Sequence, residues 1–200
     1  MNLYLQDKVI LLTDGGDFLV SLIARLLEEE GAIPCRIPLI DPEYCFNAVQ
    51  ETVRLYGRID GLVNTLAADD RVGLEQGDYT RFLQSLQQHV VFAYVITQAV
   101  RPWLQATGGA IVNMIGHLAE TGNGQSSGYA AANGGRMGLT TAWASELSGQ
   151  GIRVNGVVIK DDQQPEIAET VAFLLSPLAA GVRGELVYVD KGYVHLDKGI

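Results

Sequence analysis

The chain has 200 residues, a formal net charge of −9 at pH 7, and 48% hydrophobic against 18% charged residues. This length and hydrophobicity suit one domain with a full core and exclude an intrinsically disordered protein, and the negative charge argues against a nucleic-acid-binding surface. No apolar run reaches the roughly 20 residues of a membrane span, and the first residues, MNLYLQDKVILL, lack the features of a signal peptide. We therefore expect a cytoplasmic protein in which Cys35 and Cys45 are free thiols.

Hydrophobic patterning predicts strands and helices that alternate along the chain. In chain order these are a strand at 9–12, a helix at 18–30, a strand at 33–40, a helix at 43–56 and a strand within 57–64. They continue with a long helix at 79–105, a strand at 110–115, a helix at 129–147, a strand at 153–159, a helix at 165–175 and a strand at 185–189. Pro34 and Pro38 limit the hydrogen bonding of the second strand. This alternation predicts an α/β fold with a doubly wound parallel sheet.

Several sequence blocks resemble the short-chain dehydrogenase/reductase family, and they occur in the family's order. They are GRIDGLVN, ITQAVRPWL, GGAIVNMIG, SGYAAANGGRMGLTTAWASELSGQGIRVNGV, AFLLSP and VRGELVYVDKGY. The resemblance covers nearly the whole chain and implies a single Rossmann-like domain over residues 1–200. It also implies a family chemistry in which a nicotinamide dinucleotide is bound and hydride transfer is assisted by an Asn-Ser-Tyr-Lys set.

The turn after the first strand, TDGGDFLV, departs from the family's glycine-rich pattern. The three family glycines correspond to Asp14, Phe18 and Val20 in this sequence. Glycines there let backbone N–H groups approach a pyrophosphate, whereas we expect a β-carbon, an aromatic ring and the charges of Asp14 and Asp17 to hinder it. The family's NNAG block reads NTLA, and we expect the retained Asn64 to hold the strand end rather than a ligand. The resemblance therefore implies that this chain itself binds no cofactor.

The family's catalytic positions are largely replaced. The asparagine corresponds to His89, the serine to Gly116 and the lysine to Asn133, while the tyrosine is retained as Tyr129. In the family the lysine lowers the tyrosine pKa; without it a tyrosine keeps a pKa near 10, so roughly 0.1% is phenolate at pH 7. His117, next to Gly116, is more simply a histidine at a strand end than a replacement acid. We interpret Tyr129 as vestigial and predict no catalytic residue in this chain.

Two segments of the family are missing from the sequence. Between the second strand and GRIDGLVN, near residue 40, there is no room for one helix–strand unit. Near residue 160, IKDDQQPEIAET leaves too little chain for the lid that closes over a substrate. We therefore expect a shortened domain without a complete cofactor site or substrate lid.

One motif points to a different chemistry. GQSSG at 124–128 matches the G-x-S-x-G pattern of serine hydrolases, and His195 follows later in the chain. That pattern requires the serine on a sharp turn directly after a strand, whereas about ten loop residues separate it from the strand that ends near Ile115. The three histidines and two cysteines also lack metal-ligand spacing, so we predict no metal site.

The elements through which family members assemble are well formed. The helix at 79–105 is apolar around most of its circumference, and the helix at 129–147 is rich in alanine and glycine. We expect these two helices and the C-terminal tail, YVDKGYVHLDKGI, to contact a partner subunit. The resemblance implies that the partner is a homologous, active subunit that binds NAD.

The favoured function is therefore a noncatalytic subunit of a hetero-oligomeric NAD-dependent alcohol dehydrogenase. The small size and the losses resemble those of a noncatalytic subunit in anaerobic aromatic degradation, in a complex that oxidises a hydroxyacyl-CoA. Two alternatives stay open. One is an active NAD(P)-dependent oxidoreductase that uses Tyr129, and the other is a homo-oligomeric binding or regulatory protein on the same scaffold.

Overall fold

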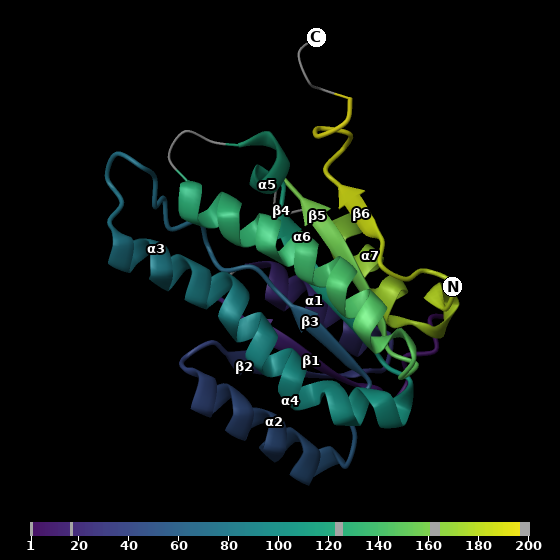
Figure 1. Cartoon of the computed structure of the whole chain (residues 1–200). Helices are drawn as coiled ribbons and strands as arrows, with labels where there is room; N and C mark the ends of the chain where they lie inside the picture. The colour runs from purple at the N-terminus through teal and green to yellow at the C-terminus, as the bar shows by residue number, and fades with distance from the viewer. Residues whose placement is uncertain (1, 17, 123–125, 161–164, 197–200) are drawn as a thin grey trace.

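Six parallel strands form one sheet in the computed structural model, which describes residues 2–16, 18–122, 126–160 and 165–196 (Figure 1). They are β1 (Val9–Asp14), β2 (Ile33–Pro38), β3 (Gly61–Asn64), β4 (Ala110–Gly116), β5 (Arg153–Ile159) and β6 (Leu186–Val189). Their order is β2-β1-β3-β4-β5-β6, and all neighbouring pairs are parallel. The chain therefore moves outward from β1 first to one side and then to the other, which confirms the predicted doubly wound, Rossmann-like sheet.

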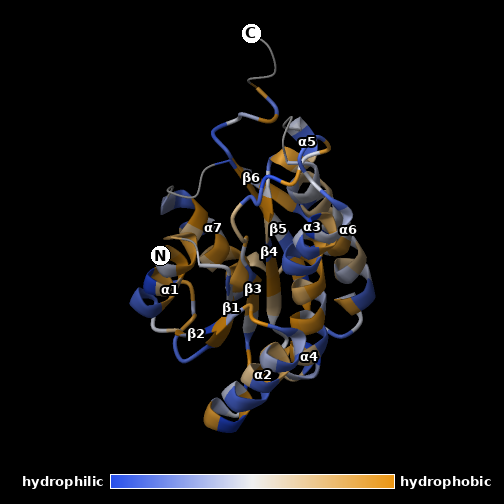
Figure 2. Cartoon of the chain, turned by 90° about the vertical axis from the view of Figure 1, so that its left-hand side faces the viewer, coloured by the Kyte–Doolittle hydropathy of each residue, from blue (hydrophilic) through white to orange (hydrophobic). Residues whose placement is uncertain are grey.

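Helices cover both faces of this sheet, and the apolar residues gather between the layers (Figure 2). One face carries α1 (Phe18–Glu29) and α7 (Pro165–Leu175), which pack against each other. The other carries α2 (Pro42–Tyr56), α4 (Phe92–Thr107) and α6 (Ser127–Ser148), with α3 (Tyr79–Leu86) beside α6. Among the described helices, none combines the length and the apolar character that a membrane crossing requires.

The predicted helix at 79–105 is not uniform. A π-helical turn at Gln87–Val91 separates α3 from α4, so the long helix is widened at the level of the candidate site. Elsewhere the boundaries differ from the prediction by a few residues: the second strand ends at Pro38, and α6 begins at Ser127. The short helix α5 (Leu118–Thr121) was not predicted, because four residues are too few for a periodic pattern.

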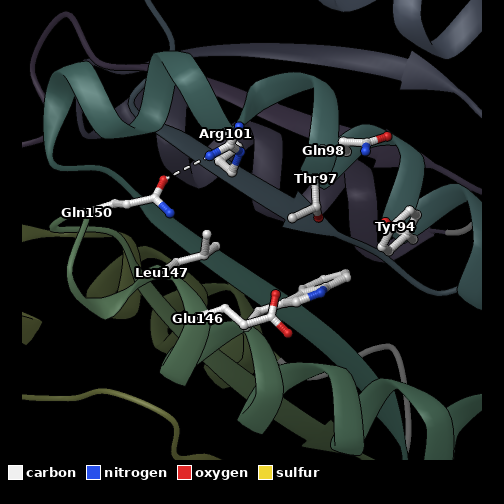
Figure 3. A pocket seen from close by; sticks show the side chains of 8 residues that line it. Tyr94, Thr97, Gln98, Arg101, Glu146, Leu147 and Gln150 are labelled. Carbon is white, nitrogen blue, oxygen red and sulfur yellow. Dashed lines mark hydrogen bonds between the residues drawn. The ribbon is translucent and has the colours of Figure 1, made fainter.

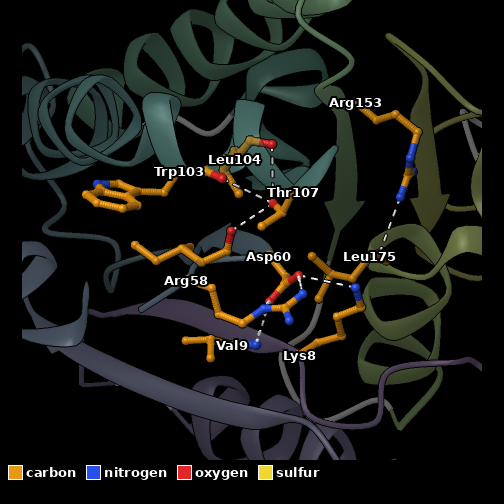
Figure 4. Close-up of polar contacts among 10 residues, drawn as sticks. Lys8, Val9, Arg58, Asp60, Trp103, Leu104, Thr107, Arg153 and Leu175 are labelled. Atoms are coloured by element: carbon orange, nitrogen blue, oxygen red, sulfur yellow. Dashed lines mark hydrogen bonds and ion pairs between the residues drawn. The ribbon is translucent and has the colours of Figure 1, made fainter. Parts of the chain in front are cut away.

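A buried carboxylate joins the amino ends of β1 and β3 (Figure 4). Asp60 accepts hydrogen bonds from the Val9 amide at 3.0 Å, from the Arg58 guanidinium at 2.6 and 2.8 Å, and from Lys8 Nζ at 3.2 Å. Burial opposes ionisation of Asp60, but the hydrogen bonds and positive charges outweigh it and hold its pKa below the usual value. This cluster fixes the end of the sheet opposite to the candidate site.

The two prolines of β2 lie on the open edge of the sheet. The Ile33 amide donates to the Lys8 carbonyl at 2.8 Å, so the N–H groups of odd-numbered residues in β2 face β1. Because successive N–H groups in a strand point to opposite sides, Pro34 and Pro38 stand where N–H groups would otherwise face outward. The prolines therefore weaken this edge as a template for pairing with another strand.

Replacing both prolines by valine (Pro34→Val with Pro38→Val) restores two outward N–H groups and should allow strand pairing at this edge. We expect concentration-dependent species larger than those of the parent protein, measured by analytical ultracentrifugation. Pro42→Val, at the first turn of α2 and away from the edge, is the control and should leave the distribution unchanged. If the double variant sediments as the parent does, the prolines do not protect this edge.

Candidate functional site

The candidate site lies where the carboxyl ends of β1, β3, β4 and β5 converge. Ligands of doubly wound folds bind at this end of the sheet, near the point where the strand order reverses. Two cavities occupy the region. The larger, of about 310 Å³, includes Gly116 and Tyr129 in its lining. The smaller, of about 240 Å³, lies beside Asp14 and Gly15 in the turn between β1 and α1.

The acidic residue of the first turn is paired rather than free. Asp14 accepts a hydrogen bond from the Gly16 amide at 2.8 Å and forms an ion pair with Arg36 of β2 at 2.9 Å. Its charge is therefore partly compensated, and the repulsion expected from the sequence is reduced accordingly. Asp17, the other acidic residue of the turn, lies outside the described residues.

The two bulky residues of the turn differ in burial. Phe18 is 60% exposed at the start of α1, so its ring lies at the surface at the amino end of that helix. Val20 is fully buried and belongs to the apolar core on the α1 side of the sheet. Val20 therefore packs into the core, and the obstruction expected from the Phe18 ring stays a prediction.

The backbone of the turn packs closely against the segment that follows β3. A β-carbon on Gly15 would lie 2.7 Å from the Leu66 carbonyl oxygen and 2.9 Å from the Ala67 α-carbon. The ends of β1 and β3 are also tied directly, because the Thr65 amide donates to Thr13 Oγ1 at 2.8 Å and the Thr65 hydroxyl donates to the Thr13 carbonyl. The smaller cavity shares Ala67 and Ala68 with the larger one, so the two cavities adjoin at the carboxyl ends of the strands.

Asn133, at the family's lysine position, is turned onto the backbone. Its Oδ1 accepts from the Gly116 amide at 2.6 Å, and its Nδ2 donates to the Tyr129 carbonyl at 2.8 Å. The side chain is fully buried. Both ends of the amide are thus used to join β4 to α6.

The other three family positions lie together. The Tyr129 ring contacts His89 edge to face, with the ring centroids 5.1 Å apart. A β-carbon on Gly116 would lie 2.8 Å from both Tyr129 Oη and Tyr129 Cε1. The tyrosine therefore occupies the space that a serine side chain at position 116 would need.

His89 is a buried, neutral histidine in the π-helical turn. Burial, followed by the nearby charge of Arg136, lowers its pKa to about 4, so the ring carries no proton charge at pH 7. Neither ring nitrogen has a hydrogen-bond partner among the described residues. His89 therefore contributes shape and an aromatic face to this site.

Arg136 is a residue of the site that the sequence analysis missed. It is 2% exposed, and its guanidinium donates to the carbonyls of His89 at 2.5 Å, Met114 at 2.8 Å and Asn64 at 3.0 Å. Burial lowers its pKa to about 10, so it stays charged at pH 7. The available signal was helical spacing: Arg136 follows Asn133 by three residues, which places it on the same face of α6.

Asn64 holds the strand ends, as expected. Its Nδ2 donates to Asn113 Oδ1 at 2.8 Å and to Thr97 Oγ1 at 3.3 Å. Asn113 in turn donates to Thr140 Oγ1 at 2.9 Å. This buried chain of polar side chains joins β3 and β4 to α4 and α6.

The G-x-S-x-G sequence does not form a nucleophile elbow among the described residues. Ser126 immediately precedes α6, well after the end of β4, and its hydroxyl donates to the Asp69 carboxylate. The His195 ring packs on Tyr188 instead, with centroids 4.4 Å apart. Gly124 and Gln125 lie outside the described residues. The hydrolase alternative has no support from this geometry.

A groove of about 400 Å³ separates α4 from α6 on the face away from the sheet (Figure 3). Its lining combines apolar and polar side chains, and Arg101 Nη1 donates to Gln150 Oε1 across one end at 3.3 Å. Elsewhere on its surface, α6 exposes Gly134 and Gly138, where an added β-carbon would meet nothing within 4 Å. The lining residues of the groove are Tyr94, Thr97, Gln98, Arg101, Trp143, Glu146, Leu147 and Gln150.

Comparisons with known proteins identify the family. A family model described as Enoyl-(Acyl carrier protein) reductase matches residues 6–160. The 3-oxoacyl-[acyl-carrier-protein] reductase FabG of Thermotoga maritima is 26% identical over 211 aligned positions, covering 90% of this chain and 86% of that protein. Cis-4-hydroxycyclohexanecarboxylate dehydrogenase of Sinomonas cyclohexanicum is 29% identical, covering 86% of this chain and 81% of that protein.

A solved structure shows the same fold. The crystal structure of Cj0485 dehydrogenase matches with a TM-score of 0.93 and 24% identity, covering 100% of this chain and 99% of that chain. Together with the family model, which spans well over half of the sequence, these findings agree with the motifs described above. The chain therefore belongs to the short-chain dehydrogenase/reductase family of oxidoreductases.

Proposed function

We propose that this chain is a noncatalytic subunit of a hetero-oligomeric, NAD-dependent short-chain dehydrogenase, in which a homologous subunit carries the active site. The main observation behind the proposal is that Asn133 replaces the family's lysine. The Asn133 side chain is fully buried and its amide binds the Gly116 amide and the Tyr129 carbonyl, so it offers no positive charge to a cofactor ribose.

The neighbouring positions support the same conclusion. Gly116 provides no hydroxyl group to orient a carbonyl substrate, and the Tyr129 ring fills the space where one would stand. His89 is buried with a pKa of about 4, so it is a poor proton donor at pH 7. Of the set of side chains that assists hydride transfer in the family, only the tyrosine is kept in this chain, as Tyr129.

The cofactor side also favours this proposal. The cavity beside Asp14 and Gly15 is about 240 Å³, and the turn packs directly on the segment after β3. We propose that the dinucleotide is bound by the partner and not by this chain. The close contact of Gly15 with Leu66 and Ala67 supports this part of the proposal. The Phe18 ring, which is exposed, does not enter it.

The alternative of an active oxidoreductase has one observation in its favour. Arg136 is a buried cation on the same helix as Tyr129, and the two groups attract each other electrostatically. A positive charge near a phenol lowers its pKa and would help it to donate a proton. We favour the noncatalytic role because the family's lysine, serine and asparagine positions hold Asn133, Gly116 and His89 in this chain.

We propose that the groove between α4 and α6 receives the equivalent helices of the homologous subunit. The exposed side chains of Val91 and Tyr94 provide apolar area on the α4 side, and Gly134 and Gly138 allow close helix approach on the α6 side. Close approach of two helices needs small residues at the contact. Oxidation of a hydroxyacyl-CoA in aromatic catabolism is the proposed task of the complex.

Tyr129→Phe tests the noncatalytic role within the native complex. Since the proposal assigns no proton transfer to this hydroxyl, we expect the turnover of the complex to stay within about twofold of the parent. The control is the same substitution of the catalytic tyrosine in the active subunit, which should abolish turnover. Steady-state kinetics of the purified complex measures both, and a loss of more than about tenfold in Tyr129→Phe would favour the active-enzyme alternative.

Gly138→Arg tests the docking face. The monomer has open space at this position, and replacing a helical glycine by arginine favours the helix by up to about 1 kcal/mol, so the variant should fold. We expect the hetero-oligomer to be lost in native mass spectrometry while the circular dichroism spectrum is unchanged. Gly181→Arg is the matched control, since its β-carbon also meets nothing within 4 Å and it lies on neither α4 nor α6.

Two results would count against this docking proposal. The first is an intact hetero-oligomer in the Gly138→Arg variant. The second is native material, purified from its source, that consists of this chain alone, which would favour the homo-oligomeric alternative.

A further inference from the structure

Besides Gly116 and Tyr129, the larger cavity of the candidate site is lined by residues that do not correspond to the family's catalytic positions. It measures about 310 Å³ and lies at the carboxyl ends of β4 and β5. Two of its lining residues, His117 and Lys160, directly follow these strands. One wall is apolar and consists of Leu66, Ala67, Ala68, Leu118 and Ile159.

Lys160 presents a positive charge to this cavity, and the two aspartates that follow it, Asp161 and Asp162, lie outside the described residues. The Lys160 Nζ lies 3.6 Å from the centroid of the Tyr193 ring, and no ion pair within the described part of the chain involves it. A cation on an aromatic face keeps its remaining donors available to an anion. The charge is therefore held in place and open to a ligand.

The acidic side chain in the lining is already occupied. Asp69 Oδ1 accepts from the Arg71 amide at 2.9 Å, and Oδ2 accepts from the Ser126 hydroxyl. His117 is not a competing cation, because burial and then the charge of Lys160 lower its pKa below the ordinary value. The polar side of the cavity therefore holds one cation, Lys160, at which an anion can bind, and one carboxylate, Asp69, which keeps its negative charge.

The C-terminal segment follows β6 at the same end of the sheet (Figure 1), and Tyr193 belongs to this segment. Asp190 is 4% exposed and accepts from the amides of Gly192 and Val194, both at 2.8 Å, and Val194 is fully buried. The Tyr193 ring also contacts the His117 ring, with centroids 5.2 Å apart. The described part of the tail is therefore folded onto its own sheet, beside the place where the sequence lacks the family's lid.

We propose that this cavity binds a small monocarboxylate with an apolar body. The carboxylate would pair with Lys160, and the apolar body would lie against the wall formed by Leu66 and Ile159. Small-molecule sites usually combine an apolar wall with a few polar or charged groups that orient the ligand. This inference goes beyond the proposed subunit role, since it assigns the chain a ligand of its own that involves neither a dinucleotide nor a partner.

Benzoate and benzamide form the test pair, because they have nearly the same size and differ in charge. Isothermal titration of the full-length chain at pH 7 and constant ionic strength should give one benzoate site per chain. Since the ion pair with Lys160 is absent for the amide, we expect benzamide to bind at least about tenfold more weakly. The titration contains no nucleotide, so its outcome is independent of whether the noncatalytic role is correct.

Lys160→Gln should remove this preference, so that benzoate and benzamide bind with similar affinity. Lys160 is exposed, so the substitution should not disturb folding. Lys191→Gln, a neighbouring lysine outside the cavity lining, is the matched control and should keep the parent's preference. No benzoate binding at millimolar concentration, equal binding of the two probes to the parent, or an unchanged preference in Lys160→Gln would each overturn the proposal.

Discussion

The side-chain amide of Asn133 bridges β4 and α6, and the character of the whole site depends on this bridge. By accepting from the Gly116 amide and donating to the Tyr129 carbonyl, it satisfies two backbone groups in a region that water does not reach. Leaving either group unpaired would cost about 1–3 kcal/mol. The residue at the family's lysine position therefore serves the backbone, and a long charged side chain could not take its place without breaking both contacts.

Arg136 completes this rearrangement from the next turn of the same helix. Its guanidinium ties the π-helical turn at His89 to the carboxyl ends of β3 and β4 through three carbonyl groups. A buried charge is costly unless its donors are satisfied, and here carbonyl dipoles take the place of a carboxylate. The site thus keeps a positive charge, but the guanidinium that bears it donates to backbone carbonyls of the fold. The helices that it fixes are α4 and α6, which are also the walls of the proposed docking groove.

The sequence predicted the order and type of nearly all elements because these depend on local periodicity. The apolar runs of β1, β4 and β5 and the amphipathic pattern of α1 are properties of neighbouring residues. The π-helical turn could not be predicted from periodicity, because one widened turn within a long apolar helix hardly changes the apolar pattern of the sequence. The family alignment also located His89, Gly116, Tyr129 and Asn133 at one site, and the structure brings them together.

Side-chain direction and pairing across the sheet could not be predicted. Phe18 matches a family glycine in position, yet it faces solvent because it begins α1. Asp14 is paired with Arg36, which lies on another strand, so its charge could not be judged from the turn alone. The C-terminal segment is held locally by Asp190, which accepts from two amides, and across the sheet by the contact between the Tyr193 and His117 rings. No periodic pattern in the sequence reports these contacts.

We propose that the cofactor turn and the catalytic positions of this chain serve its own fold and bind no nucleotide. Calorimetric titration of NADH and NADPH into the isolated full-length chain is the decisive experiment. We predict no saturable heat for either nucleotide, with the active relative under the same conditions giving a normal binding curve. A micromolar dissociation constant for one nucleotide, with a stoichiometry of one per chain, would contradict this proposal.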